Sequence, residues 1–551
     1  MSQMPKPTDE HRRLPLGTGR RGGRKAQREV TRNMNAMVRA CLVLFMIGCH
    51  PRGAPAAGAA AIVRERYDRD QAARMVPMLC EVLRFPTVAG NDKARSDQQA
   101  WLTTTGQALG LTVRDAGLVT EIELPGPSGA PVLGLLVHGD VQPVEATKWT
   151  IPPFDGASRD GYVLGRGAAD DKGPLVQALL AMKALRESGV ARTHTIRLLV
   201  GSDEESANKD IAQYLETHRP PDYSLVLDSD FPVVVGEKAW NLLTLTTPLD
   251  ERAGGKAFPY RTTDLEAGLA ASIVPDQARI VLRWRAGQPD WEPLTARLRA
   301  HKPAEGTRLE LDARGETLAV IVSGKSAHGG VNLEGGRNAL VALASIMEGE
   351  LPAGGANDLL GAARLAGQDL YGTGFGLTQS DPLWGRYAVN VATIKPPAPK
   401  SGSTAAGNVD RQLAINLRRP PPLTGPELKV KLDAWVKELN GRTGAHMATG
   451  GFYDDEPLVF DPAAKIVKRL MAAYARAAGT PASPGISGGG TYAKRMPNSI
   501  AFGMWFPGAP YPGHDVDEKV PISDLHRGVH VLIEAMVDLA SGPPLHEPFK
   551  P

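Results

Sequence analysis

The sequence is poor in cysteine and has only one short apolar run near its N-terminus. Its 551 residues include three cysteines, Cys41, Cys49 and Cys80. Three cysteines exclude a disulfide framework and a cysteine-based metal cluster, so any metal has to be held by His, Asp and Glu. The apolar stretch Ala40–Gly48 has nine residues, whereas a membrane-spanning helix needs about 20.

An excess of charge of one sign is also missing from most of the chain. Residues 1–40 contain ten Lys and Arg against three Asp and Glu, and the remainder contains 53 against 57. A nearly neutral body argues against a nucleic-acid-binding surface. With 42% hydrophobic and 22% charged residues, the chain has an ordinary globular composition and is long enough for two or three domains.

The N-terminal segment, residues 1–61, is interpreted as a signal region followed by a tether. Ala40–Gly48 has the length of a signal-peptide core, and Met46–Cys49 resembles a lipoprotein cleavage box that would leave Cys49 lipidated. Residues 50–61 are rich in Pro, Gly and Ala, which favours a tether. The interpretation predicts a periplasmic or cell-envelope protein with a lipid anchor. Two other interpretations fit the same residues: a basic tail with a chance apolar run, or a start codon assigned upstream of the true one.

Short apolar runs alternate with helical patterns after the first expected helix, which begins near Ile62. This alternation predicts an α/β domain with a largely parallel sheet, formed by residues 62–238 and 423–548. The expected strands are Val132–Val137, Ile196–Val200, Ser224–Leu227 and Ser499–Gly503, and the expected helices are Gly173–Arg186 and Ala463–Ala478.

The pattern changes between residues 239 and 422, where an inserted α+β lid domain is expected. Gln277–Trp284 and Leu318–Val322 look like antiparallel strands, and Gly354–Gly376 looks irregular because it is rich in Ala and Gly.

Ligand-type side chains follow the expected strands. His138 and Asp140 follow the first strand, Glu204 and Glu205 the second, and Asp228 the third. In open α/β sheets this edge is where sites form. Asp170 and Asp171 lie in a glycine-rich loop, and His514 lies after the last strand.

Two divalent ions in one site need a bridging carboxylate and two terminal ligands each. The five candidates are His138, Asp170, Glu205, Asp228 and His514. Imidazole with carboxylate suits zinc, with manganese or cobalt as substitutes. Glu204 remains free to take a proton from water.

Six segments, in order, carry a resemblance to a known family. They are His138–Val144 (HGDVQPV), Gly165–Pro174 (GRGAADDKGP), Asp203–Ser206 (DEES), Asp228–Pro232 (DSDFP), Ser326–Gly329 (SAHG) and Gly488–Asn498 (GGGTYAKRMPN). Over about residues 65–545 the chain resembles the di-zinc peptidase family of carnosinase, aminoacylase, succinyl-diaminopimelate desuccinylase and bacterial Xaa-His dipeptidases.

The resemblance implies roles for the metal ligands and their neighbours. It assigns His138 and Asp228 to one zinc, Glu205 and His514 to the other, and Asp170 to both. It makes Asp140 the residue that orients His138. It makes Glu204 the base that deprotonates a metal-bridging water and then protonates the leaving amine. The family also implies a cis peptide bond between Asp170 and Asp171, and Asp171 itself is expected to be structural.

The resemblance also implies how a substrate is held. His328 would stabilise the oxyanion from the lid, Arg418 would bind the C-terminal carboxylate, and the backbone of Gly488 and Gly489 would assist. The lid is large, which in the family accompanies a monomer. Ser272 stands where dipeptidase relatives have Asn, so any contact of that residue with substrate is not carried over.

Within the family, the sequence around Asp228, with Gly236–Lys238 after it, resembles that of the Xaa-His dipeptidase branch. The expected activity is hydrolysis of dipeptides with a free amino group, and an N-acyl-amino-acid deacylase of the same family is the alternative. Gly485–Gly489 also matches the Gly-x-Ser-x-Gly pattern of serine hydrolases, but Gly479–Pro484 before it does not suit a central strand. A binding lipoprotein that kept the fold and lost the chemistry is a further alternative, although no ligand is missing.

Overall fold

The computed structural model describes residues 54–254, 256–397, 410–509, 511, 513–542 and 545. Residues 56–551 form one compact unit. Ala40–Gly48 and Cys49, on which the signal-sequence and lipidation predictions depend, lie outside the described residues. Within the part of the chain that the structure describes, no helix combines the length and apolar character needed to span a membrane.

The first of two large sheets has nine strands and a parallel centre. Eight strands lie in the order β1 (Thr112–Ala116), β2 (Val119–Leu124), β6 (Thr195–Gly201), β3 (Val132–His138), β7 (Tyr223–Val226), β22 (Ser499–Ala501), β9 (Val234–Glu237) and β20 (Leu458–Val459), and β21 (Gly485–Ser487) pairs with β9. Strands β6, β3, β7 and β22 run parallel, whereas β1, β2 and β20 pair antiparallel. The predicted α/β class is confirmed, with antiparallel edges that the alternation of apolar runs did not reveal.

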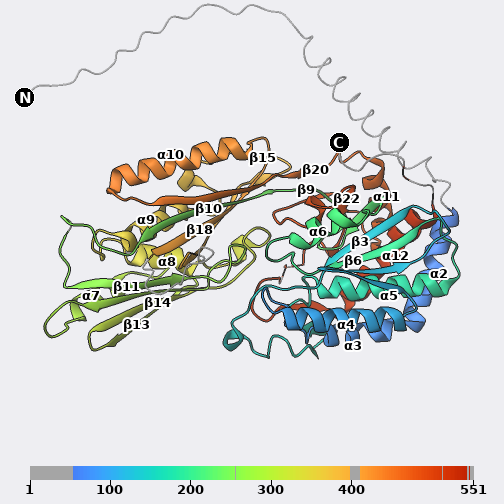
Figure 1. The fold of residues 1–551 in the computed structure, drawn as a ribbon, viewed down its shortest axis with the longest axis horizontal. Coiled ribbons are helices and arrows are strands. Elements are labelled where there is room, and N and C mark those ends of the chain that lie inside the picture. Colours follow the sequence, from blue (N-terminus) through green and yellow to red (C-terminus); the bar gives the residue numbers. More distant parts are fainter. Residues whose placement is uncertain are drawn as a thin grey trace, which may run out of the picture. The chain divides into compact units, whose positions relative to one another are not determined.

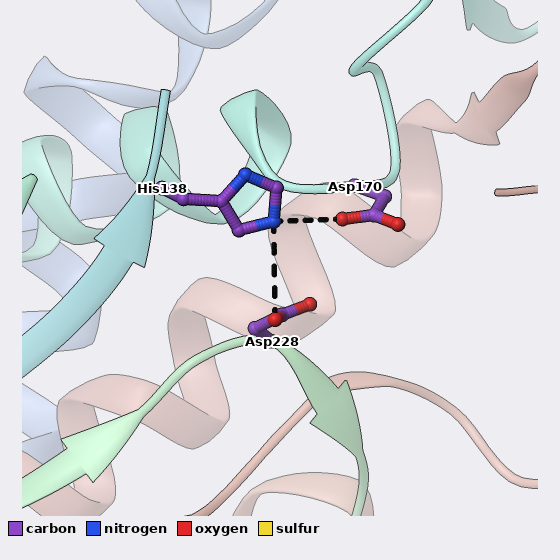
Figure 2. Close-up of side chains that lie close together, drawn as sticks. All are labelled: His138, Asp170 and Asp228. Atoms are coloured by element: carbon purple, nitrogen blue, oxygen red, sulfur yellow. Dashed lines mark hydrogen bonds and ion pairs between the residues drawn. The ribbon is translucent and has the colours of Figure 1, made fainter. Parts of the chain in front are cut away.

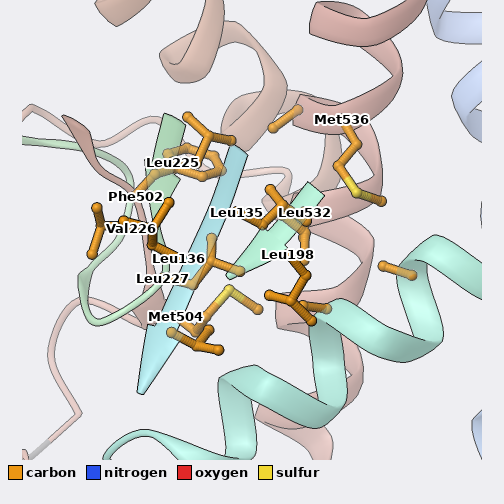
Figure 3. Packing of buried hydrophobic residues seen from close by; sticks show 14 of the residues in the cluster. Leu135, Leu136, Leu198, Leu225, Val226, Leu227, Phe502, Met504, Leu532 and Met536 are labelled. Carbon is orange, nitrogen blue, oxygen red and sulfur yellow. The ribbon is translucent and has the colours of Figure 1, made fainter. Parts of the chain in front are cut away.

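Helices cover this sheet and bury its apolar strands. They are α2 (Ala54–Asp70), α3 (Met75–Val82), α4 (Asp92–Ala108), α5 (Lys172–Ser188), α6 (Lys209–Thr217), α11 (Lys465–Ala478) and α12 (Ile522–Ser541). In the core, Leu135 and Leu198 of the central strands lie close to Leu532 and Met536 of α12 (Figure 3). Helix α5 is followed by Gly189, which adopts a left-handed conformation that glycine tolerates best.

The second large sheet has eight strands, all paired antiparallel (Figure 1). Its order is β13 (Arg308–Arg314), β14 (Thr317–Ser323), β12 (Gln277–Trp284), β11 (Tyr260–Ala267), β17 (Ala388–Lys395), β18 (Asp410–Arg419), β10 (Ala239–Pro248) and β19 (Ala448–Asp455). A separate apolar core joins this sheet to α7 (Glu292–Ala300), α8 (Ala339–Ile346), α9 (Gly355–Ala366) and α10 (Gly425–Thr443). The sheet and helices with this core are called the lid.

Shorter elements complete the described fold. They are the sheet of β4 (Ala157–Arg159), β5 (Tyr162–Leu164) and β24 (Lys519–Pro521), the pairs β8 (Ser229–Asp230) with β23 (Met504–Trp505) and β15 (Ser380–Asp381) with β16 (Gly385–Arg386), and the 3-10 turns Ala72–Arg74, Ala146–Lys148, Leu333–Gly335, Thr373–Phe375 and Tyr492–Lys494.

Three segments differ from the sequence-based expectations. Helix α2 begins at Ala54, before the expected start near Ile62, because alanine has the highest helix propensity and Pro55 is tolerated in a first turn. Helix α9 occupies Gly355–Ala366, where the glycines had suggested irregular structure. The lid sheet continues past residue 422, since β19 pairs with β10.

Candidate active site

The candidate ligands gather at the carboxyl ends of three neighbouring parallel strands. His138 is the last residue of β3, Asp228 follows β7, and Glu204 and Glu205 follow β6. Because β3 pairs in parallel with both β6 and β7, their carboxyl ends meet at one edge of the sheet. The central strands therefore deliver an imidazole and three carboxylates to the same place.

The first group of ligands consists of His138, Asp170 and Asp228 (Figure 2). His138 Nε2 lies 2.9 Å from Asp170 Oδ1 and 3.8 Å from Asp228 Oδ2. The other ring nitrogen, Nδ1, donates to the backbone carbonyl of Asp140 at 3.0 Å. This hydrogen bond directs Nε2 toward the two carboxylates, as in histidines that bind metal.

The second group consists of Asp170, Glu205 and His514. His514 Nε2 lies 3.1 Å from Glu205 Oε1 and 3.2 Å from Asp170 Oδ2. Asp170 thus faces one histidine with each of its carboxylate oxygens. It is the one residue common to both groups.

Electrostatics in this cluster favour cations. Burial lowers the pKa of His514, but Glu205 and Asp170 outweigh burial and raise that pKa to about 10. Burial and the charges of Asp171 and Asp170 hold the pKa of Asp228 well above its usual range. The neighbouring carboxylates thus favour a bound proton both on His514 and on Asp228, and a metal ion can take the place of these protons. The imidazole and carboxylate donor set fits divalent metal ions.

Asp170 is held by a buried carboxylate on another segment. Glu518 accepts hydrogen bonds from the backbone N–H of Ala169 at 2.9 Å and of Asp170 at 3.2 Å. It also accepts from Arg166 Nη1 at 2.7 Å. The peptide bond between Asp170 and Asp171 is cis, which confirms the expectation. The hydrogen bonds to Glu518 thus fix the backbone of the loop at Asp170.

Asp140 and Asp171 support the cluster through backbone contacts. The carboxylate of Asp140 accepts the N–H groups of Glu204 at 3.2 Å and Glu205 at 2.9 Å, and it lies 3.6 Å from His138 Nδ1. The carbonyl of Asp140, more than its carboxylate, orients His138. Asp171 Oδ2 accepts the N–H of His138 at 3.1 Å.

Glu204 lines the cavity next to both ligand groups without belonging to either. Burial, followed by the charges of Asp228 and Glu205, holds the pKa of Glu204 well above its usual range, although His138 opposes the shift. A carboxylate with a raised pKa is a stronger base than a solvated one.

His328 reaches the same cavity from the lid. Its Nδ1 accepts the N–H groups of Gly330 at 3.0 Å and Val331 at 2.9 Å, so we assign the proton of the neutral ring to Nε2. Burial and the neighbouring cationic side chains His514 and Arg418 hold the pKa of His328 well below its usual range. The ring centroids of His328 and His514 are 4.5 Å apart. His328 is therefore a neutral hydrogen-bond donor beside the ligand cluster.

Arg418 is buried and lines the larger cavity beside the cluster. Its Nε donates to Asn416 Oδ1 at 2.9 Å. This cavity has a volume of about 630 Å³ and also contains Glu204, His328 and His514. A guanidinium at this place can bind an anionic end of a ligand through its remaining N–H groups.

The two predicted glycines differ in what they can contribute. The N–H of Gly489 donates to Ser487 Oγ at 2.9 Å, so this N–H already has a hydrogen-bond partner within the loop. Gly488 lies against Gly330, where a Cβ would come within 2.0 Å of the Gly330 carbonyl oxygen. Gly488 therefore permits a close approach of the lid to this loop.

Three further residues at the site were not predicted from the sequence. Tyr511 donates from its hydroxyl to Asp170 Oδ2 at 2.6 Å. Glu518 holds the Asp170 loop, as described above. Gln142 Nε2 donates to Glu205 Oε2 at 2.8 Å and to Ser272 Oγ at 3.0 Å. Gln142 lies within the His138–Val144 segment, whereas Tyr511 and Glu518 lie outside all six segments that carry the family resemblance.

The sequence is similar to those of known proteins. Residues 134–538 match the model of peptidase family M20/M25/M40. The putative dipeptidase YtjP of Bacillus subtilis is 27% identical over 442 residues, which cover 80% of this chain and 89% of that protein. The Beta-Ala-Xaa dipeptidase of Lactobacillus delbrueckii subsp. lactis is 26% identical, with 75% and 83% covered.

Solved structures share the fold. Human carnosine dipeptidase 1 aligns with a TM-score of 0.54 and 13% identity, covering 87% of this chain and 99% of that one. The di-peptidase Dug1p of Saccharomyces cerevisiae gives 0.54 and 14%, covering 88% and 99%.

The matched span takes in the parallel sheet, both ligand groups and the lid, so the chain belongs to peptidase family M20/M25/M40. It is a metallopeptidase, and its site holds candidate metal ligands.

Proposed function

We propose that the protein hydrolyses dipeptides with a free amino group and uses two zinc ions. The observation that carries the proposal is the position of Asp170, one oxygen of which faces His138 and the other His514. A shared carboxylate between two histidine–carboxylate groups is the arrangement that two metal ions require.

In this proposal the two ligand groups hold the metals, and the surrounding side chains carry out the proton transfers. His138 and Asp228 would hold one ion, Glu205 and His514 the other, and Asp170 both. The ions would supply Lewis-acid polarisation of the scissile carbonyl and would lower the pKa of water. Manganese or cobalt can substitute in such a donor set.

Glu204 takes the proton of the attacking water and delivers it to the leaving amine. Its position supports this role, because Glu204 lines the cavity next to both ligand groups without belonging to either. His328 donates from Nε2 to the oxygen that becomes negative in the tetrahedral state. Arg418 binds the carboxylate of the C-terminal residue.

The choice of dipeptides over N-acyl amino acids is supported by Asp228 and by the names of the relatives, which are a putative dipeptidase and a Beta-Ala-Xaa dipeptidase. The alternative remains a deacylase of the same family. The test is hydrolysis of paired substrates, Ala-Ala and N-acetyl-Ala, by zinc-reconstituted protein. Cleavage of the free dipeptide alone supports the proposal, and cleavage of the acetylated amino acid alone contradicts it.

The metal mechanism has its own control. Chelation should abolish hydrolysis and added zinc should restore it, whereas a fluorophosphonate probe should leave Ser487 unlabelled. Labelled Ser487 with activity that survives chelation would favour a serine hydrolase instead.

We also propose that the protein acts as a monomer, because His328 reaches the ligand groups of its own chain. We further propose, from the N-terminal sequence, a lipid anchor at Cys49 and a location in the cell envelope. Metabolic labelling with a fatty acid, compared between the wild type and Cys49→Ala, tests the anchor.

A further inference from the structure

The wall of the large cavity next to Arg418 is built by side chains in register on three lid strands. Across β18, β10 and β19, Arg418 pairs with Trp240, and Trp240 pairs with Asp455. Two residues along, Leu242 of β10 pairs with Tyr453 of β19. Residues two apart on a strand share a face, and all five line the cavity.

This wall is aromatic and apolar where it adjoins Arg418. The Arg418 guanidinium lies 6.0 Å from the centre of the Trp240 ring. The rings of Trp240 and Tyr453 meet edge to face with centroids 5.4 Å apart. Leu242 lies opposite Tyr453. These three side chains, Trp240, Leu242 and Tyr453, are called the aromatic wall.

The outer edge of the aromatic wall carries charged side chains that pair with one another. Arg495 Nη1 lies 2.9 Å from Asp455 Oδ1, and Arg495 Nη2 donates to the Tyr453 hydroxyl at 3.0 Å. Lys494 Nζ lies 3.3 Å from Asp455 Oδ2. Asp455 is thus already paired with two cations, while Glu237 and Glu204 lie near Lys494 and Arg418. A cationic ligand side chain at this edge would meet the Arg495 guanidinium and find Asp455 already paired.

We propose that the aromatic wall is the subsite for the side chain of the C-terminal residue, and that it selects large apolar or aromatic side chains and rejects Lys and Arg. The inference rests on the proposed dipeptidase function, in which Arg418 binds the terminal carboxylate. The side chain of that residue branches from the carbon that bears the carboxylate. It therefore has to lie near Arg418, where Trp240 provides the adjoining ring. An aromatic side chain there replaces water with ring contacts.

The experiment measures kcat/KM for Ala-Phe, Ala-Ala and Ala-Lys with the zinc-loaded enzyme. We expect the order Phe, then Ala, then Lys. In Trp240→Ala, the ratio of kcat/KM for Ala-Phe to that for Ala-Ala should fall about tenfold. A ratio within one preparation does not depend on the fraction of folded enzyme. Trp284→Ala is the matched control, because Trp284 lies on β12 of the same sheet, packs on Trp291 and does not line this cavity.

Arg495→Glu tests the charge at the edge while leaving the Trp240 ring in place. The side chain of Arg495 is 32% exposed, so its replacement should leave the fold intact. The ratio of kcat/KM for Ala-Lys to that for Ala-Phe should rise about tenfold or more.

The outcomes separate the two proposals. Cleavage of all three dipeptides with equal efficiency, or unchanged ratios in both variants, would overturn the subsite while leaving the dipeptidase function in place. Failure to cleave any of the three would overturn the proposed function and the subsite with it. Altered ratios in Trp240→Ala and Arg495→Glu, with wild-type ratios in Trp284→Ala, support the subsite.

Discussion

Tyr511 donates a hydrogen bond from its hydroxyl to Asp170 Oδ2, with the two oxygens 2.6 Å apart. The same carboxylate oxygen faces His514 Nε2 at 3.2 Å. Burial and the charge of Asp170 hold the pKa of Tyr511 well above its usual range, so the hydroxyl keeps its proton and remains a donor. Tyr511 is therefore a positioning residue for the carboxylate that the two ligand groups share.

Tyr511→Phe should lower metal affinity or kcat about 10- to 100-fold, as is typical when the hydrogen-bond partner of a metal ligand is removed. Zinc titration followed by dipeptide hydrolysis measures both quantities. Tyr162→Phe is the matched control, because Tyr162 lies on β5 and is 36% exposed. Equal zinc affinity and kcat in Tyr511→Phe and wild type would remove Tyr511 from this role.

Glu204→Gln should separate chemistry from metal binding. The side chain lies in the cavity beside both ligand groups but belongs to neither, so the amide should retain zinc. Loss of the proton acceptor should lower kcat about 100- to 10,000-fold. Zinc content measured by elemental analysis, together with kcat, checks both parts. The exposed Glu216→Gln on α6 serves as control, and substantial activity in Glu204→Gln would assign the base elsewhere.

The parallel core and the ligand positions could be predicted because each rests on local signals. Apolar runs such as Val132–Val137 mark buried strands, and ligand-type residues placed directly after them must meet at one sheet edge. The antiparallel edge strand β1 escaped prediction because its residues are mostly exposed and lack an apolar run. Helix α9 escaped because Gly355 and Gly361 suggested irregular structure, although Leu359 and Leu360 between them are buried.

Contacts made through the backbone could not be predicted from the sequence for a different reason. The carbonyl of Asp140 orients His138, while its carboxylate holds the N–H groups of Glu204 and Glu205. Every residue has a carbonyl and almost every residue an N–H, so residue type gives no indication of such a contact. Glu518 carries a carboxylate, but its partners on the Asp170 loop lie about 350 residues away in the sequence, and only the fold brings them together.

Glu518→Gln should destabilise the protein as well as the site. Glu518 is fully buried and accepts hydrogen bonds from Arg166 and from the N–H groups of Ala169 and Asp170. A neutral amide would leave the buried Arg166 guanidinium without its counter-charge, at a cost of about 3–5 kcal/mol in the free energy of unfolding. Urea unfolding measures this loss. Glu310→Gln, on an exposed part of β13, should change the free energy of unfolding by less than about 0.5 kcal/mol.

His194 makes the stability of the metallopeptidase depend on pH at a position away from the metal ligands. The ring is buried, with Nε2 2.7 Å from the Tyr223 hydroxyl and Nδ1 2.9 Å from Thr193 Oγ1. Burial lowers the pKa of His194, and the nearby charge of Arg469 lowers it further.

A histidine with a lowered pKa in the folded state binds fewer protons there than in the unfolded state. Its contribution to stability is therefore constant above the unfolded pKa of about 6.5 and becomes unfavourable as the pH falls below it. His194→Gln removes this proton linkage. The free energy of unfolding, measured in urea from about pH 8 to about pH 5.5, should decline less steeply in the variant than in the wild type. Because His138 and His514 are present in both proteins, their contributions cancel in the difference, and parallel curves would show that His194 is not the linked group.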